Sequence, residues 1–308
     1  MDEDGAPRIA IHCEPDRRPL LEGAVRDGGG DVVAVADAEG VVWTHWSDVE
    51  GIRSLLDHNP HLRWVQLATA GVDAIAPVIG PDREWTCAKG CFSAPIAEHA
   101  LTLALAGLRH VHDYSRAITF GTPAGRNLLG ADVVVVGGGG IATALLDLLV
   151  PFGTSTTVVR RRPAPMPGAT AVVGPVELDD ALTRADVVVL ALALTEDTHH
   201  LIGAPQLSAM RPSSWLVNVS RGAHVDTAAL VDALATGQIG GAALDVTDPE
   251  PLPAGHPLWS EPRCIITPHT ACTPEMGNVR FAERVRENVR RRRHHEPLLG
   301  RIDPELGY

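Results

Sequence analysis

The stretch VVVVGGGGIA, residues 133–142, constrains the fold of this chain more than any other. Four valines of strand type run directly into a glycine-rich turn, and the pattern after the turn is that of a helix. Gly137 permits a tight turn, Gly139 lets the backbone approach a pyrophosphate, and Ala142 permits close packing of helix on strand. Amides at the start of such a helix favour a phosphate group. The spacing predicts a dinucleotide-binding unit, although a glycine-rich turn alone can also be purely structural.

Strand and helix patterns alternate along the whole chain. Downstream of residue 130, strands are predicted at 132–136, 156–160, 186–191, 214–219, 240–245 and 264–267, and helices at 140–150, 204–210, 226–235 and 278–295. Shorter apolar strands are predicted at 8–12, 31–35 and 40–43, with a strand running into a turn at 62–73. This alternation predicts parallel sheets covered by helices. At 308 residues the chain is too long for one ordinary domain and suits two.

The segment SAPIAEHALTLALAGL, residues 93–108, predicts a further helix, with Ser93 as its cap and Pro95 in its first turn. Apolar residues surround nearly the whole helix, so we expect it to be buried on most sides. A buried helix of this length fits between two domains or between two subunits. We therefore expect a homodimer.

The composition narrows the classes of partner. A formal net charge of −12 argues against general affinity for nucleic acid or for anionic membranes. Five cysteines without a C-x-x-C pair are typical of free thiols in a reducing compartment rather than of a metal site or disulfides. The opening MDEDGAP is not a signal peptide, and the apolar runs are shorter than the roughly 18 residues of a membrane span. We expect a cytoplasmic protein that binds small molecules and no metal.

The second strand of the dinucleotide-binding unit ends in an unusual way. Such a strand commonly ends on an acidic residue that holds the ribose of NAD, but here Arg160, Arg161 and Arg162 follow it. No acidic residue lies between Asp147 and Glu177. One arginine would mean little, because 25 of the 26 basic residues are arginine, but three in a row without an acid favour a 2′-phosphate. The sequence predicts a preference for NADP(H), with NAD(H) left open.

Polar residues follow three further predicted strands, in the stretches WLVNVSRGAHVD, GGAALDVTDPEPL and IITPHTACTPE. They are Arg221, Asp245, Glu250 and His269. Ligands meet a doubly wound sheet at the carboxyl ends of its strands, which makes these residues candidates for a site. Histidine suits proton transfer near neutral pH, and a guanidinium suits a carboxylate. Each residue taken alone also fits an ordinary surface position.

Several strings in this order resemble one family over essentially the whole chain. They are AGVD, APIAEHAL, the glycine turn, VNVSRGAHVDTAALVDAL, GAALDV, DPEPLP and ITPH. The chain resembles the D-2-hydroxyacid dehydrogenases, the D-isomer-specific family of NAD(P)-dependent oxidoreductases. Its arginine-ended strand is most similar to the branch with NADPH-dependent glyoxylate and hydroxypyruvate reductases. The resemblance implies an α/β fold of two Rossmann-like domains with doubly wound parallel sheets: a flavodoxin-like substrate domain (1–96 and 283–308) and an NAD(P)-binding Rossmann domain (97–282), with a hinge expected near Glu98 and Arg284.

The resemblance also implies roles for single residues. The implied catalytic residues are Arg221, Glu250 and His269. The implied cofactor-binding residues are Gly137, Gly139, Gly140, Ile141, Arg160, Arg161, Arg162, Val219 and Asp245. The implied substrate-binding residues are Ala70, Gly71 and Val72, whose amides would cradle a carboxylate, together with Arg221 and Trp43.

The expected activity is reduction of a small 2-keto acid, similar to glyoxylate or hydroxypyruvate, to the D-2-hydroxy acid with NADPH. His269 would be the proton donor, oriented by Glu250, and Arg221 would hold the substrate carboxylate and polarise its carbonyl. Two alternatives stay open. The fold can serve as a nicotinamide-dinucleotide-sensing scaffold, although a sensor needs no proton donor. The substrate can also be an unusual keto acid of secondary metabolism, such as a phosphonate analogue, and Thr247 stands where many relatives carry an aromatic residue.

Overall fold

The computed structural model describes residues 5–304 of the chain. By its internal contacts the chain divides into two compact units, one running to Phe92 and resuming at Thr273, the other spanning Ser93–Cys272. Each unit is described by itself. The expected domain boundaries after residues 96 and 282 stay predictions. None of the helices within residues 5–304 combines the length and the apolar character that crossing a membrane requires.

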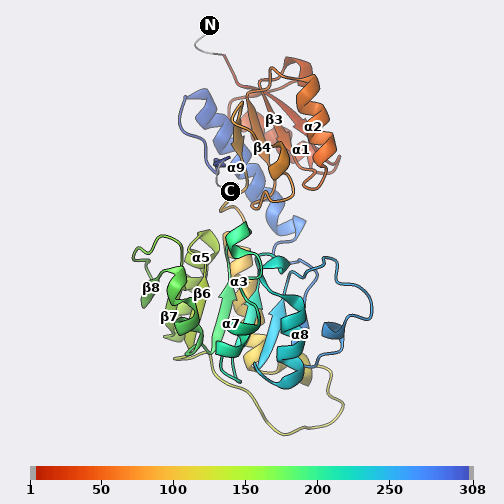
Figure 1. Ribbon diagram of the computed structural model, residues 1–308. Helices are drawn as coiled ribbons and strands as arrows, with labels where there is room; N and C mark the ends of the chain where they lie inside the picture. Colours follow the sequence, from red (N-terminus) through yellow and green to blue (C-terminus); the bar gives the residue numbers. More distant parts are fainter. Residues whose placement is uncertain (1–4, 305–308) are drawn as a thin grey trace. The chain divides into compact units, whose positions relative to one another are not determined.

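The first unit is a five-stranded parallel sheet in the order β2-β1-β3-β4-β5, which is the flavodoxin-like strand order. Its strands are β1 (Arg8–His12), β2 (Asp31–Val32), β3 (Gly40–Trp43), β4 (Trp64–Leu67) and β5 (Glu84–Thr86). Its helices are α1 (Arg18–Asp27), α2 (Val49–His58) and α9 (Pro274–Arg293), with short 3-10 helices η1 (Val35–Asp37) and η2 (Ala76–Val78) (Figure 1). Residues of α1 and α9 pack on one face of the sheet, and residues of α2 pack on the other.

The second unit is a seven-stranded parallel sheet in the order β12-β11-β10-β9-β6-β7-β8. Its strands are β6 (Asp132–Val136), β7 (Ser155–Val159), β8 (Ala171–Val173), β9 (Val187–Leu190), β10 (Trp215–Asn218), β11 (Gly241–Leu244) and β12 (Cys264–Ile266). The helices are α3 (Ser93–Leu108), α4 (Val111–Tyr114), α5 (Gly140–Leu149), α6 (Leu178–Leu182), α7 (Ala204–Ala209) and α8 (Thr227–Thr236), with 3-10 helices η3 (Val150–Phe152), η4 (Pro175–Glu177), η5 (Glu196–Thr198), η6 (Gly222–His224) and η7 (Pro257–Trp259). The strand order reverses between β6 and β9, as in the dinucleotide-binding fold.

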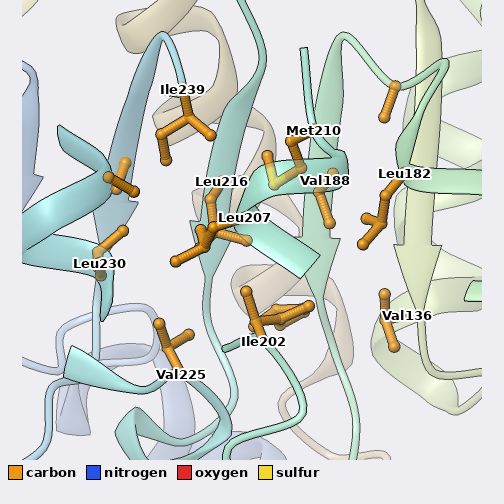
Figure 2. Packing of buried hydrophobic residues seen from close by; sticks show 14 of the residues in the cluster. Val136, Leu182, Val188, Ile202, Leu207, Met210, Leu216, Val225, Leu230 and Ile239 are labelled. Atoms are coloured by element: carbon orange, nitrogen blue, oxygen red, sulfur yellow. The ribbon is translucent and has the colours of Figure 1, made fainter. Parts of the chain in front are cut away.

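Helices cover both faces of this second sheet, which explains why its strands are mostly apolar. Residues of α6, α7 and α8 pack on one face, and residues of α3 and α5 pack on the other. Figure 2 shows the first of these cores, which contains Leu207 of α7, the strand residues Val188 and Leu216 and the loop residue Ile202. The predicted parallel, doubly wound α/β architecture is confirmed in both units.

Some elements were not predicted from the sequence, or were predicted differently. The helices α1, α2 and α6 and the strands β5 and β8 were not among the predicted elements, although buried apolar residues recur at helical spacing in α1 (Leu21, Ala24, Val25) and α2 (Ile52, Leu56). The strand expected at 31–35 is only two residues long. The helix expected at 278–295 begins earlier, because Pro274 occupies its first turn, where proline is favoured.

The helix α3 has the predicted bounds, but it is not buried on most sides within its unit. Ala97, Ala100 and Leu103 are buried against the second sheet. Leu101 and Leu105 are only half-buried. The second unit therefore leaves an apolar side of this helix partly uncovered.

Replacement of Leu216 by alanine tests the packing of the second unit. Leu216 is fully buried in β10, at the centre of the sheet, so Leu216→Ala should lower the free energy of unfolding by about 2–5 kcal/mol. Leu148→Ala is the matched control. Leu148 of α5 is 36% exposed, so its replacement should lower the free energy of unfolding by less than about 1 kcal/mol. Urea unfolding followed by circular dichroism measures both. Equal losses in the two variants would contradict this assignment of the core.

Candidate functional site

The parallel strands of the second unit bring distant segments of the chain to one edge of the sheet. Arg221 lies just after β10, Asp245 directly follows β11, and His269 lies just after β12. The glycine turn follows β6, and Arg160 directly follows β7, which pairs with β6. All these strands run in the same direction, so their carboxyl ends share the edge where ligands of such sheets bind.

His269 and Glu250, two of the predicted catalytic residues, form a direct side-chain pair. The Nδ1 atom of His269 lies 2.7 Å from Oε1 of Glu250. A carboxylate can only accept, so Nδ1 carries a proton and donates it. The imidazole and the carboxyl side chain are 53% and 41% exposed. This hydrogen bond fixes the ring and leaves Nε2 as the atom that can exchange a proton.

Hydrogen bonds to Asp245 hold the turn that carries His269. His269 itself has a left-handed backbone with φ of 53°, and its amide donates to the carbonyl oxygen of Asp245 at 2.8 Å. The Asp245 carboxylate accepts from the hydroxyl of Thr267 at 2.6 Å and from the amides of Thr270 and Ala271 at 2.9 and 3.0 Å. A left-handed conformation is uncommon for histidine and persists only where the surroundings impose it. These bonds supply that constraint.

Asp245 is ionised in this arrangement despite its burial. Its side chain is 1% exposed, and burial by itself raises the pKa of a carboxyl group. Hydrogen bonds from His99, Thr267 and the amides of the turn outweigh burial and lower the pKa of Asp245 to about 2. The resemblance implied a cofactor contact at Asp245. The structure shows in addition that its carboxylate ties together the turn after β12.

Arg221 lies on a turn that a buried asparagine organises. Asn218 is 0% exposed, and its Nδ2 donates to the carbonyl oxygen of Arg221 at 2.8 Å. Its Oδ1 accepts from the amide and the hydroxyl of Ser220 at 3.1 and 3.0 Å. Asn218 was not singled out from the sequence. The signal available for it was an amide side chain at the end of an otherwise apolar strand.

The Arg221 turn abuts the segment that leads to Glu250. A side chain on Gly222 would collide with the backbone of Thr247, so the two segments touch main chain to main chain. The amide of Thr247 in turn donates to Oε2 of Glu250 at 3.4 Å. Arg221 is half-buried, and its Nη1 donates to the carbonyl oxygen of Ser220 at 2.8 Å. The structure thus joins the Arg221 segment to the His269–Glu250 pair through the backbone.

The glycine turn has the geometry that phosphate binding needs. Gly137 has φ of 115°, and a side chain there would collide with the carbonyl of Ala191 at the end of β9. A side chain on Gly139, in contrast, would meet no atom within 4 Å. The helix α5 begins at Gly140, the half-buried Ile141 follows, and the first turn has no acidic residue. Open space above backbone amides at a helix N-terminus fits a pyrophosphate.

Arg160 lies directly over this turn. Its Cδ and Nε atoms come within 2.8 Å of where a side chain on Gly138 would begin. Among the described residues, no carboxylate forms an ion pair with Arg160 or Arg162, and Arg161 and Arg162 are exposed. The guanidinium therefore lies beside the amides rather than being neutralised elsewhere. Val219, the other residue implied for the cofactor, is buried just beyond β10.

The residues implied for substrate binding in the first unit differ in their accessibility. Ala70 is exposed, Gly71 is half-buried and Val72 is buried, on the segment that follows β4. In the described part of the chain, the amides of these three residues donate to no backbone carbonyl. Trp43 is 1% exposed: its indole stacks on His12 and donates to the carbonyl of His45. The structure thus places Trp43 in the core, while the nearby Trp46 is 62% exposed.

Known proteins resemble this chain over the second unit and over most of its length. Residues 101–271 match the family model described as D-isomer specific 2-hydroxyacid dehydrogenase, NAD binding domain. An uncharacterised protein of Corynebacterium melassecola is 36% identical over 257 residues, which cover 80% of this chain and 84% of the relative. The glyoxylate reductase of Thermofilum pendens is 32% identical over 297 residues, which cover 91% of this chain and 84% of that enzyme.

A solved structure extends the likeness to both units. It is a D-isomer specific 2-hydroxyacid dehydrogenase from Xanthobacter autotrophicus Py2, in complex with NADPH and MES. The two chains superpose with a TM-score of 0.85 at 27% sequence identity, covering 99% of this chain and 100% of the other.

Asp245→Asn tests the role of the buried carboxylate in stability. The pKa of Asp245 is about 2 in the fold, whereas a free carboxyl of this kind titrates near about 3.9. The ionised group therefore stabilises the fold above about pH 4, and this contribution is lost as the pH falls towards 2. At pH 7 the free energy of unfolding of the variant should be about 2–3 kcal/mol lower than that of the wild type, and this difference should be smaller at pH 3. Urea titrations at both pH values measure this difference. Asp57→Asn, at an exposed position of α2, is the control. A loss of stability that does not depend on pH would refute this role of Asp245.

Proposed function

This chain belongs to the D-isomer specific 2-hydroxyacid dehydrogenase family, NAD(P)-dependent oxidoreductases, and we propose that it reduces a small 2-keto acid of the glyoxylate or hydroxypyruvate kind to the D-2-hydroxy acid with NADPH. One observation carries this proposal. The 2.7 Å hydrogen bond between His269 and Glu250 presents an oriented imidazole at the strand edge that also holds the glycine turn. The glyoxylate reductase of Thermofilum pendens supports the choice of substrate class.

His269 is the proton donor in the direction of reduction. Its Nδ1 is occupied by Glu250, so proton transfer to the keto oxygen proceeds from Nε2. The Glu250 carboxylate stabilises the positive charge of the protonated ring and holds its orientation. In the reverse direction the same ring accepts the proton of the 2-hydroxyl group. Glu250 thus acts through His269 and not on the substrate.

Substrate recognition needs groups that bind a carboxylate and polarise a carbonyl. Arg221 provides a planar, permanently charged guanidinium for this purpose, on the turn that Asn218 organises. In the first unit, the amides of Ala70, Gly71 and Val72 are our candidates for carboxylate binding, because they donate to no backbone carbonyl among the described residues. Trp43 is not part of the proposal, since it is buried in the core.

The cofactor contributes hydride transfer to the keto carbon, and the chain supplies the groups that hold it. The turn at Gly137, Gly139 and Gly140 accommodates the pyrophosphate, with Ile141, Val219 and Asp245 implied as further contacts. Arg160, lying over Gly138, supports a preference for the 2′-phosphate of NADPH, with Arg161 and Arg162 next to it. A structural relative that covers 99% of this chain was solved with NADPH.

We also propose that the protein is a homodimer. The half-buried Leu101 and Leu105 leave an apolar side of α3 partly uncovered. In the same unit, the segment between α4 and β6 carries Ile118 and Phe120 with side chains that are almost wholly exposed, at 98% and 109%. Large apolar side chains at this exposure favour contact with another chain. A second copy of this chain is the partner that the proposal names.

Two alternative functions are distinguishable from this one. A nicotinamide-sensing scaffold would bind NADPH without turning over keto acids. A reductase of an unusual keto acid, such as a phosphonate analogue, would bind NADPH and fail on ordinary substrates. The hydrogen-bonded His269–Glu250 pair favours an enzyme over a sensor, because a binding protein needs no oriented proton donor.

Absorbance at 340 nm with NADPH and a panel of 2-keto acids tests the activity. The panel contains glyoxylate, hydroxypyruvate, pyruvate, phenylpyruvate and oxaloacetate. We expect turnover of glyoxylate or hydroxypyruvate, and a loss of about 10²- to 10⁴-fold in kcat for His269→Ala, because the proton donor is gone. His58→Ala, at an exposed position of α2, is the control and should leave kcat unchanged. Tight binding of NADPH with no turnover across the panel would contradict the proposed substrates.

Arg160→Asp tests the cofactor preference. The wild type should show a higher kcat/KM with NADPH than with NADH, and this variant should lower that ratio by about tenfold or more, since a carboxylate repels the 2′-phosphate and can accept from a 2′-hydroxyl. Arg53→Asp, which changes an exposed arginine on α2, should leave the ratio unchanged. Equal use of both cofactors by the wild type, or an unchanged ratio in Arg160→Asp, would show that the arginines do not select the cofactor.

A further inference from the structure

A histidine outside the predicted catalytic set touches the base of the active-site turn. His99 lies on α3, and its Nε2 is 3.0 Å from Oγ1 of Thr267 and 3.3 Å from Oδ1 of Asp245. Its side chain is 20% exposed, and the Asp245 side chain is 1% exposed. His99 is distant in sequence from both partners, so the fold brings it there.

The directions of these hydrogen bonds follow from their chemistry. The hydroxyl of Thr267 donates to Oδ1 of Asp245 at 2.6 Å, so its oxygen is free to accept a proton from elsewhere. A carboxylate also only accepts. Both neighbours of Nε2 are thus acceptors, and Nε2 of His99 must carry a hydrogen that it shares between them. His99 is the donor that completes this cluster.

The cluster connects α3 to His269 in two steps. Asp245 binds the amides of Thr270 and Ala271, on the C-terminal side of His269, and its carbonyl accepts from the amide of His269 itself. Thr267 lies on the other side of His269 in the chain. A donor that fixes both the Thr267 hydroxyl and the Asp245 carboxylate therefore restrains the turn at both ends.

We propose that His99 is a positioning residue that holds His269 in place through Thr267 and Asp245. As a statement about catalysis, this rests on the proposed function, in which His269 transfers the proton. His99 itself contacts neither the pair of His269 and Glu250 nor the glycine turn among the interactions that the described residues make. Its contribution is to keep the uncommon left-handed backbone of His269, with φ of 53°, in one conformation.

Nε2 of His99 is one of several donors that orient the carboxylate of Asp245. Its Oδ1 faces Thr267, Thr270 and His99, whereas its Oδ2 accepts from Ala271. A carboxylate oxygen with several fixed donors has a defined orientation, and loss of His99 removes one of the three donors to Oδ1 and the donor to the Thr267 hydroxyl oxygen. Without His99, both the carboxylate and the Thr267 hydroxyl gain freedom, and the turn above them loosens.

Three variants separate positioning from general stability. His99→Leu removes the donor and keeps an apolar side chain of similar reach. His99→Gln restores a donor, because its amide nitrogen can occupy a place close to that of Nε2. His58→Leu makes the same chemical change on the exposed face of α2, in the other unit, and serves as the control. All three are compared in hydrogen exchange followed by mass spectrometry and in steady-state kinetics.

Hydrogen exchange gives a result that does not depend on activity. In His99→Leu we expect peptides covering residues 264–275 to exchange about tenfold faster or more, while the core strand β10 keeps its wild-type rate. His99→Gln and His58→Leu should show wild-type exchange in the same peptides. Unchanged exchange at 264–275 in His99→Leu, or faster exchange spread over the whole second unit, would overturn the proposal.

Kinetics add a second readout once a substrate is found. A loosened His269 should lower kcat by about 10- to 100-fold in His99→Leu, with KM for the keto acid changed by no more than about threefold. His99→Gln should recover most of kcat. Equal damage in the leucine and glutamine variants would overturn the positioning role. If the wild type turns over no keto acid, the proposed function fails, and hydrogen exchange alone decides whether His99 holds the turn.

Discussion

The parallel pairing of β9, β10, β11 and β12 is the constraint on which the candidate site depends. Because these strands run in one direction and in register, each must end at the same edge of the sheet. The chain returns through α7, through α8 or through a loop, and one polar residue of the candidate site follows each of β10, β11 and β12. Arg221 and His269 are far apart in sequence and reach one edge only because of this pairing. The apolar strands that bury themselves on both faces are what make the pairing stable.

Buried and exposed polar residues have different tasks at this edge. Asn218 and Asp245 are 0% and 2% exposed. Asn218 forms hydrogen bonds with backbone and hydroxyl groups of the turn after β10, and Asp245 does so with the turn after β12. His269 and Glu250 are far more exposed and pair with one another. The buried residues fix the turns, and the exposed pair is left accessible for chemistry. This arrangement places His269, the proposed proton donor, on a rigid support, as catalysis requires.

The sequence was informative where local pattern and fold agree. The bounds of β6 and α3 were predicted correctly, because a valine run before glycines and a long alanine- and leucine-rich stretch are strong local signals. The contact between His269 and Glu250 was expected from the family resemblance, and the structure has it. Arg160 was predicted to bind the 2′-phosphate of NADP; its side chain lies over Gly138, and the cofactor preference stays a prediction.

Other features depend on contacts that no local pattern encodes. Trp43 is the last residue of β3, where a pocket residue was expected, but tertiary packing buries it against its neighbours. Asn218 and His99 matter because of partners brought to them by strand pairing. A residue whose role is to hold another residue cannot be recognised before the partner is known.

A double-mutant cycle on kcat tests most directly the claim that His269 and Glu250 act as one unit. It compares the wild type with Glu250→Gln, His269→Ala and the two changes combined, all with the same keto acid and NADPH. If Glu250 acts only through His269, the combined variant should be no slower than His269→Ala alone, so that the two losses do not add. If the losses multiply in full, Glu250 works independently of His269, and the account of the proton donor given above is wrong.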